Sequence, residues 1–208
     1  MRIKVLDLFC GAGGSAMGIF RAFKGKCIIT GIDIREQPNY PFEFIRGDAV
    51  EFLKDTEFLK KFDFIWASPP CQAYSWASAR WRNSGYKYPD LIGVTRDMLV
   101  KVGKPFVIEN VKGAPLRKDL MLCGLMFGLR VFRHRYFEIH GFSVPQPPHP
   151  SHKGLIPYRD FFIVSGHHKG TLSEWREAMG IDWMTRDELR EAIPPAYSEY
   201  ILKHYARG

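Results

Sequence analysis

Apolar runs alternate with helical patterns in the first half of this chain, and this alternation constrains its fold more than any other feature. Residues 3–9 are β-branched and apolar, a glycine cluster follows at 11–14, and residues 15–23 then have helical spacing. Further strands are expected at 27–32, 42–45, 63–67 and 105–109, with further helices at 49–59 and 90–102. Because strands that alternate with helices pair in parallel and are covered on both faces, the sequence predicts a doubly wound, mostly parallel α/β sheet.

The alternation weakens after about residue 128. Strands are expected there at 133–139 and 160–164, with a proline-rich loop at 140–158 between them. A terminal helix is expected at 196–205. Thr171 or Ser173 can cap one helix. Thr185 can cap another, because Glu188 lies three residues further on and can complete a capping box. The diproline at 194–195 is expected to end that second helix.

The composition limits the partners and the compartment. A net charge of +8 over 208 residues favours a polyanionic partner such as nucleic acid. The four cysteines form no Cys-x-x-Cys pair, so a zinc site is not expected and a reducing compartment is favoured; they are Cys10, Cys27, Cys71 and Cys123. The N-terminus enters a strand too soon for a signal peptide, and no apolar run reaches the ~18 residues of a membrane span. We therefore expect a cytoplasmic protein with no membrane partner.

The strongest candidate for a catalytic group is a cysteine at the exit of an expected strand. The sequence there is Pro69-Pro70-Cys71-Gln72, directly after the apolar run 62–67. Prolines fix the backbone, and nucleophiles are commonly presented on loops by a rigid scaffold. Taken alone, a cysteine in this place is more often a small buried apolar residue. Three charged residues at other strand ends are candidate partners, although each alone can be structural: Glu109, Arg133 and Arg135.

A second constellation indicates a nucleoside cofactor. The glycine cluster 11–14 lets the backbone pass close to a ligand, and the helix after it offers free amide groups. Asp33 and Asp48 follow the next two expected strands, where carboxylates can bind ribose hydroxyls or lie near an adenine. The segment 75–88 mixes basic and aromatic residues, which suits phosphates and unstacked bases, although an ordinary solvated loop can have the same composition.

Seven short motifs follow one another in a distinctive order. They are Phe9-x-Gly11-x-Gly13-Gly14, Asp33, Gly47-Asp48, Pro69-Pro70-Cys71-Gln72, Glu109-Asn110-Val111, Arg133-x-Arg135 and Ala192-Ile193-Pro194-Pro195-Ala196-Tyr197. In this order the chain resembles cytosine-C5 DNA methyltransferases from about Val5 to Ile201, and its last motif is similar to that of short phage-encoded members. The resemblance implies a Rossmann-like fold that uses S-adenosylmethionine. It also implies a cofactor-binding and catalytic core at 1–137, a reduced target-recognition region at 138–190, and a C-terminal helix at 191–208 that returns to the core.

The same resemblance implies a DNA (cytosine-5-)-methyltransferase that converts S-adenosylmethionine to S-adenosylhomocysteine. Cys71 would add to C6 of cytosine, and Glu109 would contact N3 and the exocyclic amine. Arg135 would hold the O2 carbonyl, with Arg133 supporting the pocket. The residues implied in cofactor binding are Asp7, Phe9, Gly11, Gly13, Gly14, Asp33, Ile34, Asp48, Ala49, Pro69 and Tyr197. Those implied in binding duplex DNA with a flipped cytosine are Gln72, Ser75, Arg80 and Arg82.

The chain also departs from the family pattern. The interval 138–190 is short for a full recognition domain, so a loose or very short sequence preference is expected. Val131 replaces a glutamine that often opens the arginine motif, and Glu191 replaces an asparagine before the final motif, which would place a carboxylate near the cofactor. Four histidines of this interval are expected to contact phosphate or the loop, with no metal site: His149, His152, His167 and His168.

Other functions stay open on the sequence alone. An RNA (tRNA) cytosine-5 methyltransferase is one, because that branch also has a reduced recognition region. A catalytically silent DNA-binding or cofactor-sensing relative is another, although it would have no need of Cys71, Glu109 and Arg135 together. Modification of free nucleotides is a further alternative. Protection from restriction is the biological role expected for a DNA-modifying enzyme of this kind.

Overall fold

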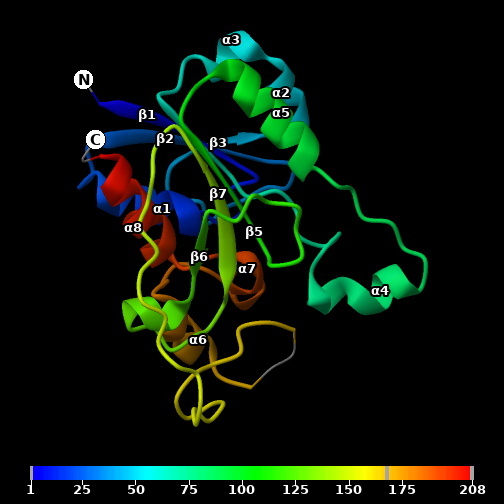
Figure 1. Ribbon diagram of the computed structural model, residues 1–208, viewed down its shortest axis with the longest axis vertical. Coiled ribbons are helices and arrows are strands. Elements are labelled where there is room, and N and C mark those ends of the chain that lie inside the picture. Colours follow the sequence, from blue (N-terminus) through cyan, green and yellow to red (C-terminus); the bar gives the residue numbers. More distant parts are fainter. Residues whose placement is uncertain (1, 167–168, 207–208) are drawn as a thin grey trace.

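The computed structural model describes residues 2–166 and 169–206, which form one sheet flanked by helices (Figure 1). The seven strands are β1 (Ile3–Leu8), β2 (Cys27–Asp33), β3 (Glu43–Arg46), β4 (Phe64–Ala67), β5 (Phe106–Asn110), β6 (Leu120–Leu122) and β7 (Arg135–His140). Their order in the sheet is β3-β2-β1-β4-β5-β7-β6. The first five strands pair in parallel, whereas β7 is antiparallel to β5 and β6. The predicted doubly wound, mostly parallel sheet is therefore confirmed.

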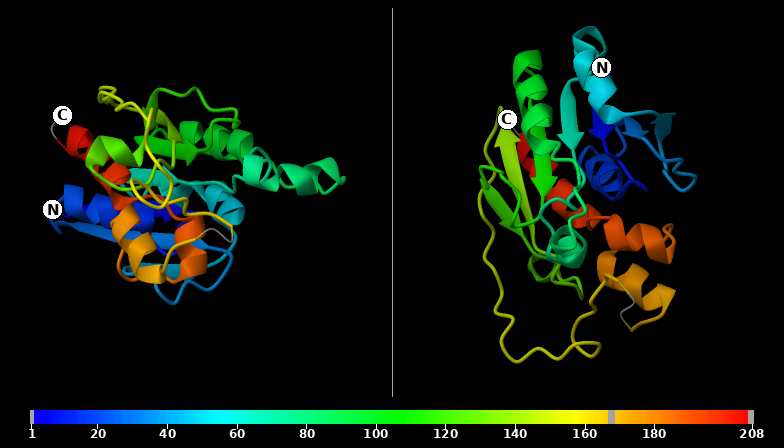
Figure 2. Two further views of the ribbon diagram at one scale, coloured as in Figure 1. Left: turned by 90° about the horizontal axis from the view of Figure 1, so that it is seen from below. Right: turned by 90° about the vertical axis from the view of Figure 1, so that its right-hand side faces the viewer.

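Helices cover both faces of this sheet. They are α1 (Gly14–Ala22), α2 (Ala49–Lys54), α3 (Thr56–Leu59), α4 (Ala79–Asn83), α5 (Ile92–Val102), α6 (Leu172–Met179), α7 (Arg186–Glu191) and α8 (Pro195–Tyr205), with 3₁₀ turns at Trp76–Ser78 and Gly124–Phe127. One apolar cluster joins α1 and α8 to one face of the sheet, and a second joins α2, α3 and α5 to the other face. Figure 2 shows α4 extending away from this body. The apolar strands are buried on both sides, as their continuous hydrophobic runs require.

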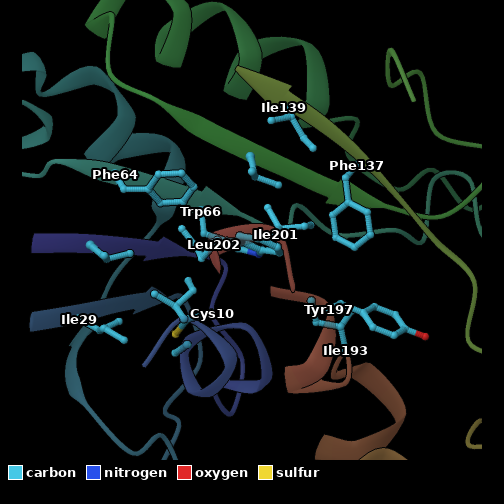
Figure 3. Packing of buried hydrophobic residues seen from close by; sticks show 14 of the residues in the cluster. Cys10, Ile29, Phe64, Trp66, Phe137, Ile139, Ile193, Tyr197, Ile201 and Leu202 are labelled. Atoms are coloured by element: carbon cyan, nitrogen blue, oxygen red, sulfur yellow. The ribbon is translucent and has the colours of Figure 1, made fainter. Parts of the chain in front are cut away.

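The contact between α1 and α8 places the C-terminal helix against the core. A Cβ atom on Gly18 would lie 2.0 Å from the carbonyl oxygen of Pro195 and 2.1 Å from Oγ of Ser198, so only glycine permits this close approach. The Ser198 hydroxyl also donates a 2.8 Å hydrogen bond to the Ser15 carbonyl. Figure 3 shows Ile193, Tyr197, Ile201 and Leu202 beside Trp66 and Phe137 of the sheet. The chain end therefore returns to the core.

A third, smaller apolar cluster lies under α6 and α7. Trp175, Met179 and Met184 are fully buried in it, and it reaches the core through Ala12 and Val131. Thr171 and Thr185 cap the two helices with complete capping boxes, in which Glu174 and Glu188 return the hydrogen bonds. The predicted caps are confirmed, with Thr171 rather than Ser173 at the first helix.

Several predicted elements differ from those observed. The helix expected at 49–59 is broken at Asp55, whose carboxylate instead accepts a 2.9 Å hydrogen bond from the amide of Phe58, as aspartate at an N-cap does. The strand expected at 133–139 starts only at Arg135, because Arg133 has a φ of 32°, outside the extended region. No strand forms at 160–164 in the described chain: Phe161 and Phe162 make only isolated bridges. The three-residue strand β6 was not predicted, because three residues are too few for a periodic signal.

Candidate active site

A cleft of about 1280 Å³ lies where the parallel strands end. Open α/β sheets bind ligands at this edge, because the loops after the strands converge there. Strands β1, β2, β4 and β5 deliver Phe9, Asp33, Cys71 and Glu109 to the cleft wall. Strand β7 runs in the opposite direction, so it begins at the edge where β5 ends and brings Arg135 to the same place. The sheet topology thus gathers residues that are far apart in the sequence.

The loop that carries Cys71 is fixed on both sides. The Cys71 carbonyl accepts hydrogen bonds from the amides of Tyr74 (2.9 Å) and Ser75 (2.8 Å). The buried Asn110 donates a 2.8 Å hydrogen bond from Nδ2 to the carbonyl of Pro69, which ties this loop to the end of β5. The thiol is half-buried. Burial raises its pKa, whereas the positive charge of Arg135 opposes this shift, so this cation favours the thiolate form.

Glu109 and Arg135 form a buried ion pair beside the thiol. Nε of Arg135 lies 2.9 Å from Oε1 of Glu109, with side-chain exposures of 15% and 8%. Burial raises the pKa of Glu109, although the charge of Arg135 opposes the shift. A carboxyl group in this environment keeps a proton to higher pH than a solvated one, and it can therefore donate that proton to a ligand in the cleft.

Arg133 connects the core to the loop before α6 and to α7 itself. Its guanidinium donates hydrogen bonds to the carbonyls of Val164 (2.8 Å) and Arg190 (2.5 Å). Its backbone has a φ of 32°, and its carbonyl accepts a 3.0 Å hydrogen bond from the hydroxyl of Tyr197. Burial, and then the charge of Arg135, lower the pKa of Arg133 to about 9, so it stays positively charged at neutral pH. Arg133 adds positive charge to the wall, and Tyr197 supports it from behind.

The glycine-rich loop forms the other end of the cleft. Gly11 has a φ of 49°, and a Cβ atom there would meet no other atom within 4 Å, so its backbone faces open space in the cleft. Asp33 accepts 3.0 Å hydrogen bonds from the amides of Gly11 and Arg35. Asp48 caps α2 through the amide of Val50 and also lines the cleft. Both carboxylates thus sit in fixed positions along one wall.

Two charged side chains pair across this end of the cleft. The guanidinium of Arg35 forms an ion pair with the carboxylate of Glu191, and both residues line the cleft. The hydrogen bond that Arg35 donates to Glu191 raises the pKa of Arg35. The charge of Glu191, a residue expected from the sequence to lie near the cofactor, is therefore compensated by Arg35, a cleft residue that the motifs did not identify.

Most of the predicted site residues line the cleft, and five do not. Asp7 is fully buried in β1, and its carboxylate accepts hydrogen bonds from Ser15 and Tyr40; burial raises its pKa to about 8. The others that do not line it are Gly13, Arg80, Arg82 and Tyr197. Nη1 of Arg82 instead donates to the carbonyls of Gln72 and Ser75, so this cation orders the loop after Cys71.

The comparisons with known proteins agree with this architecture. A solved structure described as the S. pombe Dnmt2 methyltransferase superposes with a TM-score of 0.61 and 14% sequence identity, over 97% of this chain and 98% of that one. The fold is thus that of the Rossmann-like methyltransferases. Residues 3–119 match the family model of the C-5 cytosine-specific DNA methylases. The match covers more than half of the chain, which therefore belongs to this family.

Individual relatives support the same assignment. The chain is 30% identical to the Type II methyltransferase M.HpaII of Haemophilus parainfluenzae over 80% of its own length and 46% of that protein. It is 32% identical to M.NlaIV of Neisseria lactamica over 54% of its own length and 28% of that protein. These alignments span less than half of either relative. The family predicted from the motifs is confirmed, whereas the likeness to phage-encoded members stays a prediction.

No helix among the described residues is both long and apolar enough to cross a membrane.

Proposed function

We propose that this protein transfers a methyl group from S-adenosylmethionine to C5 of cytosine in DNA. One observation carries the proposal: the Cys71 thiol shares a single cleft with the Glu109–Arg135 pair at one end and the Gly11 loop at the other. A nucleophile, a proton donor and a cofactor loop are the parts that this reaction needs. The membership in the C-5 cytosine-specific DNA methylases and the Type II methyltransferase relatives support the same assignment.

The glycine-rich end of the cleft fits S-adenosylmethionine. The open space at Gly11 leaves room for a ligand against the backbone. The N-terminus of α1 has no side-chain cap and no acidic residue in its first turn, so its free amides suit a carboxylate. Asp33 and Asp48 would bind the ribose and lie near the adenine. When bound, the cofactor supplies an electrophilic methyl group. The remaining cleft residues that would hold it are Phe9, Gly14, Ile34, Ala49 and Pro69.

Three predicted cofactor residues would act indirectly. Asp7 positions Ser15 at the start of α1 through its 3.0 Å hydrogen bonds. Gly13 has a φ of 84° and allows the turn into that helix. Tyr197 holds the backbone of Arg133. Each of these residues would keep a cleft residue in place rather than contact the cofactor.

The chemistry of the chain's own residues follows from the environment of the thiol. Cys71 loses its proton and adds to C6 of cytosine, which moves negative charge onto N3 and O2 of the ring. Glu109 donates a hydrogen bond or its proton at N3, because burial raises the pKa of its carboxyl group and makes it a better proton donor near neutral pH. Arg135 stabilises both the thiolate and the charge at O2. After C5 has gained the methyl group and lost its proton to a base, the bond between Cys71 and C6 breaks.

Access to C6 requires the cytosine to leave the DNA stack. Gln72 and Ser75 line the cleft beside Cys71, and Oε1 of Gln72 is buried without a hydrogen-bond partner, so it can accept one from the DNA. Arg80 is exposed on α4 and is placed to contact phosphate. Arg82 would hold the loop in shape for these contacts. The segment between 138 and 190 would give a loose or very short sequence preference.

The decisive experiment measures methyl transfer from labelled S-adenosylmethionine to duplex DNA, single-stranded DNA and tRNA in parallel. The wild-type protein should yield 5-methylcytosine in duplex DNA, and Cys71→Ala should be inactive. Cys27→Ala is the matched control, because Cys27 lies in β2 outside the cleft. Equal transfer by wild type and Cys71→Ala would refute the mechanism, and transfer to tRNA alone would identify an RNA enzyme.

A trapping experiment tests the covalent step independently. Cytosine carrying fluorine at C5 has no removable proton there, so the adduct should persist after methyl transfer. Mass spectrometry should place the methylated nucleotide on the peptide that contains Cys71. Attachment to any other residue would contradict the assignment of the nucleophile.

A further inference from the structure

Four side chains that can ligate a metal ion meet at the start of β7, outside the cleft. They are Cys123, His134, His149 and His152, and their ligand atoms all lie within 4.8 Å of one another. Sγ of Cys123 is 3.4 Å from Nε2 of His152, and Nε2 of His134 is 3.2 Å from Nε2 of His149. Two separate hydrogen-bonded pairs would explain these two distances. Two independent pairs need not lie next to each other, however, whereas here all four ligand atoms lie together.

Two of the distances between these ligand atoms are close to the edges of a coordination tetrahedron. Zinc–nitrogen bonds of about 2.05 Å and a zinc–sulfur bond of about 2.3 Å give tetrahedral edges of about 3.3 Å between nitrogens and about 3.6 Å between nitrogen and sulfur. The two observed distances, 3.2 Å and 3.4 Å, are close to these values. The other four distances are at most 4.8 Å, so a small movement of the side chains would bring all four atoms to the distances that a metal ion requires.

We propose that Cys123, His134, His149 and His152 form a structural zinc site. One thiolate and three imidazoles suit zinc, whereas calcium and magnesium require oxygen ligands. Four protein ligands leave no open position, which is typical of structural rather than catalytic zinc. On binding, the Cys123 thiol releases its proton to solvent and its sulfur bonds to the metal.

The surroundings favour this chemistry. His134 and His152 are half-buried, so both imidazoles are partly shielded from solvent. The ring of His152 stacks on Phe132 with centroids 3.8 Å apart, which fixes its orientation. Cys123 is buried and His149 is exposed, so the site would be closed by the loop that carries His149.

The site would join three segments of the chain. Cys123 directly precedes the 3₁₀ turn Gly124–Phe127, and His134 lies between the two cleft arginines. His149 and His152 belong to the long loop after β7. A metal here would anchor that loop to the start of β7 and hold the unusual backbone of Arg133 in place. His167 and His168, also considered from the sequence, lie outside the described residues.

Metal analysis of the tag-free, full-length protein tests the proposal. We expect one zinc per chain as isolated, or after removal of metal and addition of zinc with excess zinc washed out. His149→Gln should weaken zinc binding at least tenfold, and it should fold normally because His149 is exposed. His204→Gln is the matched control, since His204 lies on α8, outside this cluster, and it should retain the metal.

A second measurement identifies the ligands. Cobalt in place of zinc should give a thiolate-to-cobalt charge-transfer absorption, which Cys123→Ser should abolish. A chelator should lower the melting temperature of the wild type by more than that of His149→Gln. Absence of bound metal after zinc addition would overturn the proposal, as would equal zinc affinity in wild type and His149→Gln. These outcomes are independent of methyl transfer, because none of them measures activity.

Discussion

Glu138 on β7 is a buried carboxylate with four hydrogen-bond contacts, and its replacement gives a quantitative prediction. Its side chain is 2% exposed. It accepts hydrogen bonds from Nε and Nη2 of Arg96 at 2.8 and 2.7 Å, and one from the amide of Arg117 at 3.0 Å. Nε2 of His140 lies 2.9 Å away. These contacts tie α5 and the segment before β6 to the strand that begins with Arg135.

The magnitude follows from the pKa of this carboxyl group. Burial alone would raise it, but the hydrogen bonds from Arg96, His140 and the Arg117 amide outweigh burial and lower it from 4.5 to about 2. A difference of about 2.5 pKa units between the folded and unfolded states corresponds to roughly 3 kcal/mol of folding stability. Because the folded-state pKa is the lower one, this contribution is present above about pH 4.5 and is lost as the pH falls towards 2.

Glu138→Gln should therefore lower the free energy of unfolding by roughly 3 kcal/mol at pH 7, in line with the loss of one partner of a buried ion pair. For a chain of this size the melting temperature should fall by roughly 6–12 °C. Urea unfolding at pH 7, 5 and 3.5 measures the effect, and the gap between wild type and variant should narrow as the pH falls.

The control for this substitution is Glu57→Gln. Glu57 is 82% exposed and pairs with Lys60 on the surface, so its loss should change stability by less than about 0.5 kcal/mol. A Glu138→Gln protein as stable as the control variant at pH 7 would refute the reasoning. A stability gap that does not change with pH would show that packing rather than ionisation stabilises this site.

Three further variants test other parts of the structure. Gly18→Ala should destabilise the fold by about 1–3 kcal/mol by overpacking α1 against α8, measured by urea unfolding; unchanged stability would contradict the close approach. Glu109→Gln removes a charge that raises the pKa of Cys71, so alkylation of this thiol at pH 7.5 should be about 3–10-fold faster. Mass spectrometry would measure the alkylation rate, and slower alkylation would contradict the direction assigned to the effect of Glu109. Arg82→Ala should accelerate hydrogen exchange in residues 72–84 about tenfold, with no change expected in β5.

The sequence predicted the parallel part of the sheet well, because its strands are buried on both faces and read as uninterrupted apolar runs. Prediction failed where tertiary contacts decide the outcome. Residues 160–164 are apolar enough for a strand, yet Phe162 packs with Trp175 in the third apolar cluster and pairs only with Val131. β6 is held by its pairing with β7, which no local pattern of three residues reveals.

The candidate site was predicted by motif rather than by geometry. Motifs place residues at the correct edge of the sheet, but they do not show which side chains line the cleft and which hold those side chains in place. Asp7 and Tyr197 are examples of support, and their positions depend on partners from α1 and from the arginine motif. The hydrogen bond from Asn110 to Pro69 joins two motifs that are neighbours only because β4 and β5 are adjacent.

The departure at Val131 has a physical explanation in the third apolar cluster. Val131 is 2% exposed and packs in this cluster with Phe162 and Trp175, so a polar glutamine at this position would be buried among apolar side chains. Arg133, two residues later, donates to the carbonyls of Val164, which also belongs to this cluster, and Arg190 of α7. The region 138–190 is thus hydrogen-bonded to Arg133 in the cleft wall. Its packing would therefore set the shape of that wall as well as any contact with DNA.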